Sequence, residues 1–222
     1  SKTGIGGNWG TFINNKKITK CDLTGVTDWG RTPTLPDVAF ANCTALQEVT
    51  LPGDMKVIGG SAFSGCAALT TVNLSQVTWI NLNAFWGCTS LETLALDNVT
   101  AIGQEAFYGC TGLETLKIPK CTQFGNYIVS GCKALTRIEA TAAGDFVDIS
   151  DGRSSIERTA VFHNRDSHYG DSAFNPAKCD LVLNADKKQG GNATPKVFSD
   201  NEWLMMPNGQ LMRWNSITFA QQ

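Results

Sequence analysis

A five-residue motif recurs at near-constant spacing through the middle of the chain. Four copies run Ala-Phe-x-x-Cys, and a fifth, worn copy keeps Ser-Gly-Cys; they occupy residues 39–43, 62–66, 84–88, 106–110 and 128–132. The phenylalanine position advances by 23 residues from 40 to 63, and then by 22 to 85, 107 and 129. Such a period is typical of stacked repeats, each of which buries its apolar side chains only against its neighbours.

Within one repeat the sequence predicts a strand, a bend and a turn. Apolar residues alternate with small or polar ones at the end of residues 91–96, as they do in 69–74 and 113–118, and this period of two indicates a short strand. Gly103, and its equivalents Asn81 and Gly125, suit a bend with positive φ. The Ala-Phe-x-Gly-Cys part is too short for an ordinary helix and predicts one helical or 3₁₀ turn on the far side of the coil.

Stacking these repeats predicts a parallel sheet, with strands about 4.8 Å apart. Alternate side chains of each strand then form exposed columns on its outer face. The first column holds Glu48, Thr71, Thr93, Thr115 and Arg137, and the second holds Thr50, Asn73, Ala95, Lys117 and Glu139. This surface is polar and weakly charged. β-propensity and neighbour packing explain its threonines as well as binding does.

The full pattern is Ala-Phe-x-Gly-Cys-x-x-Leu-x-x-Val-x-Leu, with Ile-Gly before the next Ala-Phe. It resembles the BspA-type leucine-rich repeats of bacterial cell-surface proteins, over residues 40–140 and in five copies. The resemblance implies an α/β solenoid: a right-handed coil of 22–23-residue repeats with short parallel strands, capped at both ends. It also implies a secreted or cell-surface protein that works in binding or adhesion, and it brings no catalytic residues.

The two ends of the chain depart from the repeat. We expect residues 1–39 to form an N-terminal cap with a degenerate first repeat, in which Trp9 and Phe12 cover the open core. Residues 40–140 are the array, and 141–222 a C-terminal cap subdomain. In that subdomain, strands at 179–183 and 217–219 are expected to complete the sheet. The apolar residues expected to cover the last coil are Trp203, Met205, Met206, Leu211, Met212 and Trp214.

Five of the eight cysteines recur once per repeat, at the end of the motif. Their side chains should point the same way from parallel coils, and this geometry fits disulfide torsion angles poorly. The sequence also lacks a Cys-x-x-Cys pair, which disfavours zinc. We therefore expect a buried ladder of free thiols, with Cys121 also in the core. Cys21 and Cys179 lie outside this pattern.

Composition excludes some classes of function. A net charge of −2 and a pI near 5.7 disfavour nucleic-acid binding, which needs a basic surface. We predict no transmembrane segment, because no apolar run approaches the roughly 18 residues that a span needs. Residues 1–7 do not resemble a signal peptide, so a leader is expected to have been removed. No cofactor is predicted, and the oligomeric state stays open.

Two segments of the tail carry weaker hints of chemistry. His163 and His168 flank Asp166, and a metal or acid–base site there is one interpretation; a solvated loop is the favoured one. Asp145, Asp148 and residue 151 suggest calcium but lack the acidic spacing of an EF-hand loop. The nucleophile-elbow, phosphate-loop and dinucleotide motifs are all missing, so the chain is not predicted to be an enzyme.

The sequence therefore predicts a module that binds an extracellular protein or glycoprotein through its repeat surface. A purely structural or display role is the first alternative, and a metal-dependent enzyme using residues 163–168 is the second. Trp86 and Tyr108 follow the core phenylalanine on adjacent coils; they should touch and face outward, as a contact surface or as packing for a cap. The predicted contacts on the concave strand face are Glu48, Thr71, Asn73, Thr93, Thr115, Lys117 and Arg137.

Overall fold

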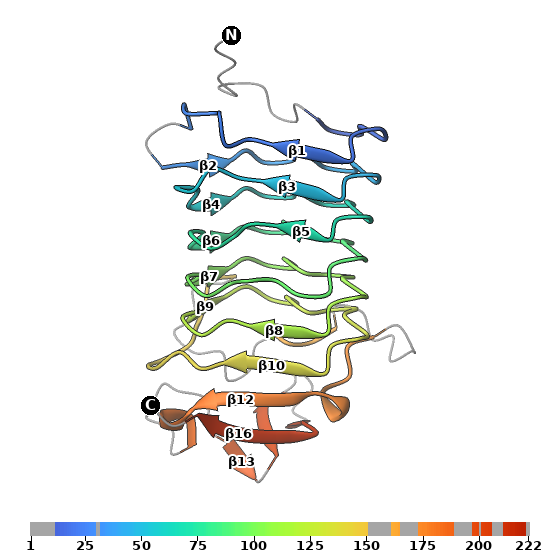
Figure 1. Ribbon diagram of the computed structural model, residues 1–222. Helices are drawn as coiled ribbons and strands as arrows, with labels where there is room; N and C mark the ends of the chain where they lie inside the picture. Colours follow the sequence, from blue (N-terminus) through green and yellow to red (C-terminus); the bar gives the residue numbers. More distant parts are fainter. Residues whose placement is uncertain are drawn as a thin grey trace.

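The computed structural model is a single stack of parallel coils, which runs from β1 near the N-terminal end to β12 and β16 near the C-terminal end (Figure 1). It describes residues 12–29, 32–150, 161–164, 173–188, 197–199, 201–205 and 211–220. The predicted solenoid of short parallel strands is confirmed.

One side of the stack, the first sheet, carries the longer strands. These are β1 (Lys20–Asp22), β3 (Glu48–Thr50), β5 (Thr71–Val72), β8 (Thr115–Lys117), β10 (Arg137–Ala140), β12 (Asp180–Asn184) and β16 (Ser216–Ala220). They pair in parallel as two blocks, β1-β3-β5 and β16-β12-β10-β8. Residues one repeat apart lie opposite each other, so that Glu48 faces Thr71 and Thr115 faces Arg137.

The strand predicted within residues 91–96 is absent, and the first sheet is divided at this coil. Leu91 and Leu96 are buried as expected, but the backbone does not join the ladder. On the preceding coil, the side chain of Asn73 turns away: it accepts from Leu51 N–H at 2.6 Å and donates to Leu51 O at 3.0 Å. Alternating hydrophobicity predicts which side chains are buried. A β-ladder also needs backbone N–H and C=O groups within hydrogen-bond distance on the neighbouring coil.

A second parallel sheet, which the sequence analysis did not predict, closes the other side of the stack. Its strands are β2 (Thr34–Leu35), β4 (Val57–Ile58), β6 (Trp79–Ile80), β7 (Ala101–Ile102), β9 (Gln123–Phe124) and β11 (Val147–Asp148). The sheet is continuous through six strands, in the order β11-β9-β7-β6-β4-β2. It therefore bridges the coil at which the first sheet is divided.

The Ala-Phe-x-Gly-Cys motif forms hydrogen-bonded turns rather than helix. Within the motif, Cys88 N–H donates to Phe85 O at 3.1 Å; between coils, Phe85 N–H donates to Ala106 O at 2.8 Å. Two residues per turn are left-handed, illustrated by Asn83 (φ 54°) and Gly87 (φ 69°). In the described residues the only helices are the 3₁₀ segments η1 (Pro176–Lys178) and η2 (Ala185–Lys188), both near the C-terminal end.

The prediction of a positive φ at Gly103 is wrong, as it is for Asn81 and Gly125. The left-handed residue comes two positions later, at Glu105 with φ 55°. Glycine at 103 is needed for a different reason, because a Cβ there would lie 2.6 Å from Leu82 N on the preceding coil. The sequence correctly indicates a position that only glycine fits. The reason is the close approach of two coils and not a positive φ angle.

A stack of phenylalanine rings forms the axis of the core. Phe12, Phe40, Phe63, Phe85 and Phe107 stack in order, with centroids 5.1–5.7 Å apart and interplanar angles of 1–16°. Phe12 thus covers the first coil as expected, and Trp9 lies outside the described residues. The three inner rings, Phe40, Phe63 and Phe85, each lie between two others, so a coil by itself would leave this apolar surface in water.

The buried cysteine ladder is confirmed. Each thiol donates to the carbonyl of the phenylalanine on the preceding coil: Cys66 Sγ lies 3.1 Å from Phe40 O, and the same contact recurs at Cys88, Cys110 and Cys132. All eight cysteines are free. Cys21 lies in β1 opposite Val49, and the buried Cys179 directly precedes β12.

The two strands expected in the C-terminal segment are present as β12 and β16. β12 and β16 pair in parallel and extend the first sheet beyond β10. An antiparallel sheet of β13 (Val197–Ser199), β14 (Glu202–Met205) and β15 (Leu211–Arg213) follows. It contributes the fully buried Trp203, and Trp214 after β15 is buried beside it, with ring centroids 6.5 Å apart. The side chains of Met205 and Met206 lie outside what the structure describes.

Replacing Gly103 by alanine should lower the free energy of unfolding by about 1–3 kcal/mol, because the added methyl group meets backbone that must shift. Gly25 is the matched control: nothing lies within 4 Å of a Cβ there, and its φ is not left-handed. Gly25→Ala should leave stability unchanged or raise it by less than about 1 kcal/mol. Urea denaturation followed by circular dichroism measures both, and equal effects of the two changes would contradict this account.

Thiol reactivity at pH 8 tests the cysteine ladder. Burial raises the pKa of Cys66 to about 12 and of Cys110 to about 12, so almost no thiolate is present to react. In native protein, we expect at most one thiol, the half-buried Cys21, to react quickly with Ellman's reagent. After unfolding in guanidinium chloride all eight should react. Rapid reaction of several thiols in the native protein would contradict a buried ladder.

Candidate functional site

The structure places most of the predicted strand-face residues on one surface. Glu48, Thr71, Thr115, Lys117 and Arg137 lie on strands of the first sheet, with exposed or partly exposed side chains. Asn73 and Thr93 are exposed but do not lie in strands. The column of side chains on the strand face is therefore interrupted at Thr93, where the backbone does not form a strand.

Three of these side chains already have partners within the chain. Glu48 pairs with Lys20 at 2.8 Å, and Arg137 Nε lies 2.7 Å from Glu139 Oε1. Exposed ion pairs of this kind are weak, so both groups remain available to a ligand. Asn73 differs, because its amide satisfies both backbone groups of Leu51. Engaging a ligand through Asn73 would leave those groups unpaired.

Trp86 and Tyr108 contact each other on adjacent coils and face outward, as predicted. Their rings are stacked, with centroids 5.7 Å apart and planes 6° apart. Trp86 remains 41% exposed and Tyr108 is partly exposed. The described part of the chain therefore does not bury the indole, which disfavours the interpretation that the pair packs beneath a cap.

The sequence analysis missed two further exposed apolar residues on the same coil. Trp79 is 46% exposed on the outer side of β6, and Leu82 is 52% exposed at the bend that follows. With Trp86, they place three of the four large exposed apolar side chains of the described residues within residues 79–86. In the sequence, Trp79 stands directly before the core residue Ile80. Because no strand was predicted at this position, the outward direction of the Trp79 side chain could not be foreseen.

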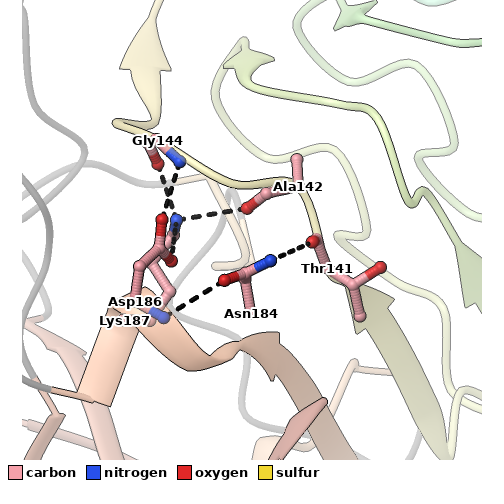
Figure 2. A network of polar contacts seen from close by, with 6 residues as sticks. All are labelled: Thr141, Ala142, Gly144, Asn184, Asp186 and Lys187. Carbon is pink, nitrogen blue, oxygen red and sulfur yellow. Dashed lines mark hydrogen bonds and ion pairs between the residues drawn. The ribbon is translucent and has the colours of Figure 1, made fainter. Parts of the chain in front are cut away.

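A buried polar network ties the C-terminal cap to the last coil (Figure 2). Lys187 is fully buried, and its Nζ donates to Gly144 O at 2.6 Å, Asp186 Oδ1 at 2.9 Å and Ala142 O at 3.2 Å. The ammonium also lies 4.4 Å from the centroid of the Phe146 ring. Asp186 Oδ2 in turn accepts from Gly144 N–H at 2.7 Å. These contacts give Lys187 a structural role.

The described residues do not support the candidate metal or acid–base site at residues 163–168 or the candidate calcium site at residues 145–151. Burial lowers the pKa of His163 to about 4, and residues 165–168 lie outside the described residues. Asp148 is buried and accepts from Ser150 N–H at 2.7 Å, while residue 151 is not described. Within the described ranges, no cluster of three metal-ligating side chains is found, and none of the helices is long and apolar enough to span a membrane.

The repeat itself identifies the chain. A family model described as the BspA type leucine-rich repeat region matches residues 11–136 in six copies. The chain belongs to this family. The match covers more than half of the sequence and begins inside the segment assigned above to the N-terminal cap. Leucine-rich repeat modules generally mediate protein binding through the extended surface that stacking creates.

Solved structures of leucine-rich repeat proteins are similar to this chain. The leucine-rich repeat protein of T. pallidum superposes with a TM-score of 0.50 at 26% identity, over 55% of this chain and 58% of that one. A leucine-rich cell surface protein from Faecalibacterium prausnitzii matches with a TM-score of 0.44 at 25% identity, over 79% and 57%. A leucine-rich repeat protein from Bacteroides ovatus matches with a TM-score of 0.44 at 17% identity, over 96% and 63%. The chain thus spans less than two thirds of each of these proteins. A search of curated proteins finds no match.

Replacing Lys187 by methionine should loosen the C-terminal cap. The change keeps the apolar stem but leaves the carbonyls of Ala142 and Gly144 without their donor, at a cost of about 1–3 kcal/mol in unfolding free energy. Lys178→Met at an exposed position of η1 is the control and should change stability by less than about 0.5 kcal/mol. Urea denaturation followed by tryptophan fluorescence compares the two, and equal stabilities would contradict a structural role for Lys187.

Proposed function

We propose that this chain is an exported, surface-associated binding module of a bacterial cell, which recognises an extracellular protein or glycoprotein through the outer surface of its repeats. Membership of the BspA-type family and the extended form of the stack support a binding role. The observation that carries the proposal is the stacked pair of Trp86 and Tyr108, whose indole remains 41% exposed. An exposed aromatic pair of this kind is typical of a contact surface.

The aromatic pair is the preferred contact region, and the strand face is the second. Trp86 and Tyr108 are held rigidly by the coils beneath them, so little side-chain freedom would be lost on binding. On the strand face, Lys117 and Arg137 offer exposed positive charge, whereas Asn73 is occupied by Leu51. The aromatic pair therefore fits the anchor of a binding surface better than the strand column does.

A binding screen tests this proposal. The purified chain would be passed over immobilised extracellular-matrix proteins and mucins, beside the double variants Trp86→Ala/Tyr108→Ala and Lys117→Ala/Arg137→Ala. We expect the aromatic double variant to weaken binding by at least about tenfold, as loss of a central anchor does. The strand-face double variant should weaken binding by less than about threefold, as loss of exposed charges does.

Other outcomes separate the alternatives. If the Lys117 and Arg137 changes cause the larger loss, the strand face is the contact surface. If the native chain binds none of the panel, the proposal of a protein or glycoprotein partner fails, and a structural or display role is favoured unless the chain binds free oligosaccharides.

A further inference from the structure

One face of the Trp86 ring is open. Along the stack, the outward position after the core phenylalanine is taken in turn by Ile13, Ala41, Ser64, Trp86, Tyr108 and Ser130; we refer to these residues as the outer column. Tyr108 stacks on one face of the indole. The neighbour on the other side is Ser64, whose coil is joined to that of Trp86 by a hydrogen bond from Gly65 N–H to Trp86 O at 2.7 Å. A serine side chain is too short to cover an indole ring.

The other end of the aromatic stack is closed. Beyond Tyr108 the outer column continues with Ser130, which is buried. Residues 161–164 run alongside this turn: Ile128 N–H donates to Val161 O at 2.9 Å, and Gly131 N–H donates to Asn164 Oδ1 at 3.0 Å. The stack therefore presents its free ring face at the Trp86 end, toward Ser64.

The stretch of chain that carries this face has no charged residue. Residues 57–91 contain no Asp, Glu, Lys, Arg or His, although charged residues make up 17% of the chain and about six would be expected in a stretch of this length. Two acids lie in the neighbouring turns of the stack: Asp37 Oδ1 accepts from Gly60 N–H at 2.6 Å, and Glu105 is buried. Residues 57–91 themselves offer a charged ligand no counter-charge, so charge complementarity favours a neutral one.

The polar groups beside the open face are hydroxyls and amides. Ser61, Ser64 and Asn83 lie on the two turns that flank it, and all three side chains are partly exposed. A neutral sugar matches this arrangement: one face of a pyranose ring is lined with C–H groups, which pack on the electron-rich face of an aromatic ring. Its hydroxyl edge takes uncharged donors and acceptors.

We infer that Trp86, backed by Tyr108 and flanked by Ser61, Ser64 and Asn83, binds the ring of a neutral sugar in a glycan chain. This inference rests on the proposed binding function and gives its ligand a chemical class. The indole supplies the stacking face, and Tyr108 holds that indole in place. The glycan is carried by a glycoprotein or is a free polysaccharide, because both present the same ring.

Isothermal titration with neutral hexasaccharides of glucose, mannose and N-acetylglucosamine tests the inference, with oligogalacturonate as the anionic comparison. We expect at least one neutral oligosaccharide to bind and the anionic one not to bind. Trp86→Ala should weaken binding by at least about tenfold, and Tyr108→Ala by a smaller factor. Ile13→Ala is the matched control, since it removes an exposed apolar side chain from the same column; it should leave affinity unchanged.

A second variant separates ring stacking from general apolar contact. Ser64→Leu should cover the open face of Trp86 while adding apolar surface, and the bulky Ile13 in the same column shows that the turn accepts a branched side chain. Sugar binding should fall by at least about tenfold, whereas a protein seated on an apolar patch should bind as well or better. Unchanged circular dichroism and melting temperature would show that the variant is folded.

The outcomes for the sugar and for the binding function are distinguishable. Failure of all three neutral oligosaccharides to bind, or unchanged sugar affinity in Trp86→Ala, overturns the inference. If a glycoprotein from the screen still binds after enzymatic removal of its glycans, the binding function stands and the sugar inference falls. If a bound glycoprotein is displaced by the free oligosaccharide, the inference is supported with the glycoprotein as the source. Oligosaccharide binding without any glycoprotein partner supports a free polysaccharide.

Discussion

The structure depends on contact between successive coils. Each coil is held to the next by hydrogen bonds along the second sheet and the turns, and by the stacking of Phe40, Phe63, Phe85 and Phe107 at 5.2–5.7 Å. No coil has a core of its own. Stability is therefore a sum of neighbour interfaces, and both ends of the stack need a covering layer. Phe12 supplies it at one end, and Trp203 with Trp214 at the other.

Stacking also decides which side chains meet on the surface. Residues 22 positions apart become neighbours, so Trp86 and Tyr108, one repeat apart in the sequence, form a stacked pair. The same rule places Ser64 beside the free face of Trp86. The strand face carries a column of β-forming residues such as Thr71, Thr93 and Thr115, whereas the outer column changes from the small Ser64 to the bulky Trp86 between adjacent coils. This difference makes the turn side the more informative surface for function.

The role of a residue in the caps, unlike that of a residue in the array, does not follow from the repeat pattern. Within the array, one pattern explains most of the buried apolar positions, and each substitution can be judged against its counterparts in other coils. At the C-terminal end, Lys187 is buried among carbonyls and beside Phe146, and nothing in the local sequence distinguishes it from the solvated lysine of a loop. Its environment is built by residues 142–146, more than 40 positions away, so only the folded chain defines its role.

The sequence by itself determined the solenoid, the repeat length, the inward phenylalanines and cysteines, and the contact between Trp86 and Tyr108. These follow from periodicity, because equal spacing puts equivalent residues at equivalent places. Tertiary structure alone decided the second sheet, the missing strand at residues 91–96 and the reason for glycine at 103. Each of these depends on how closely two coils approach and which backbone groups come within hydrogen-bond distance. These approaches involve groups on neighbouring coils, such as Leu82 N beside Gly103, and not only the pattern within one repeat.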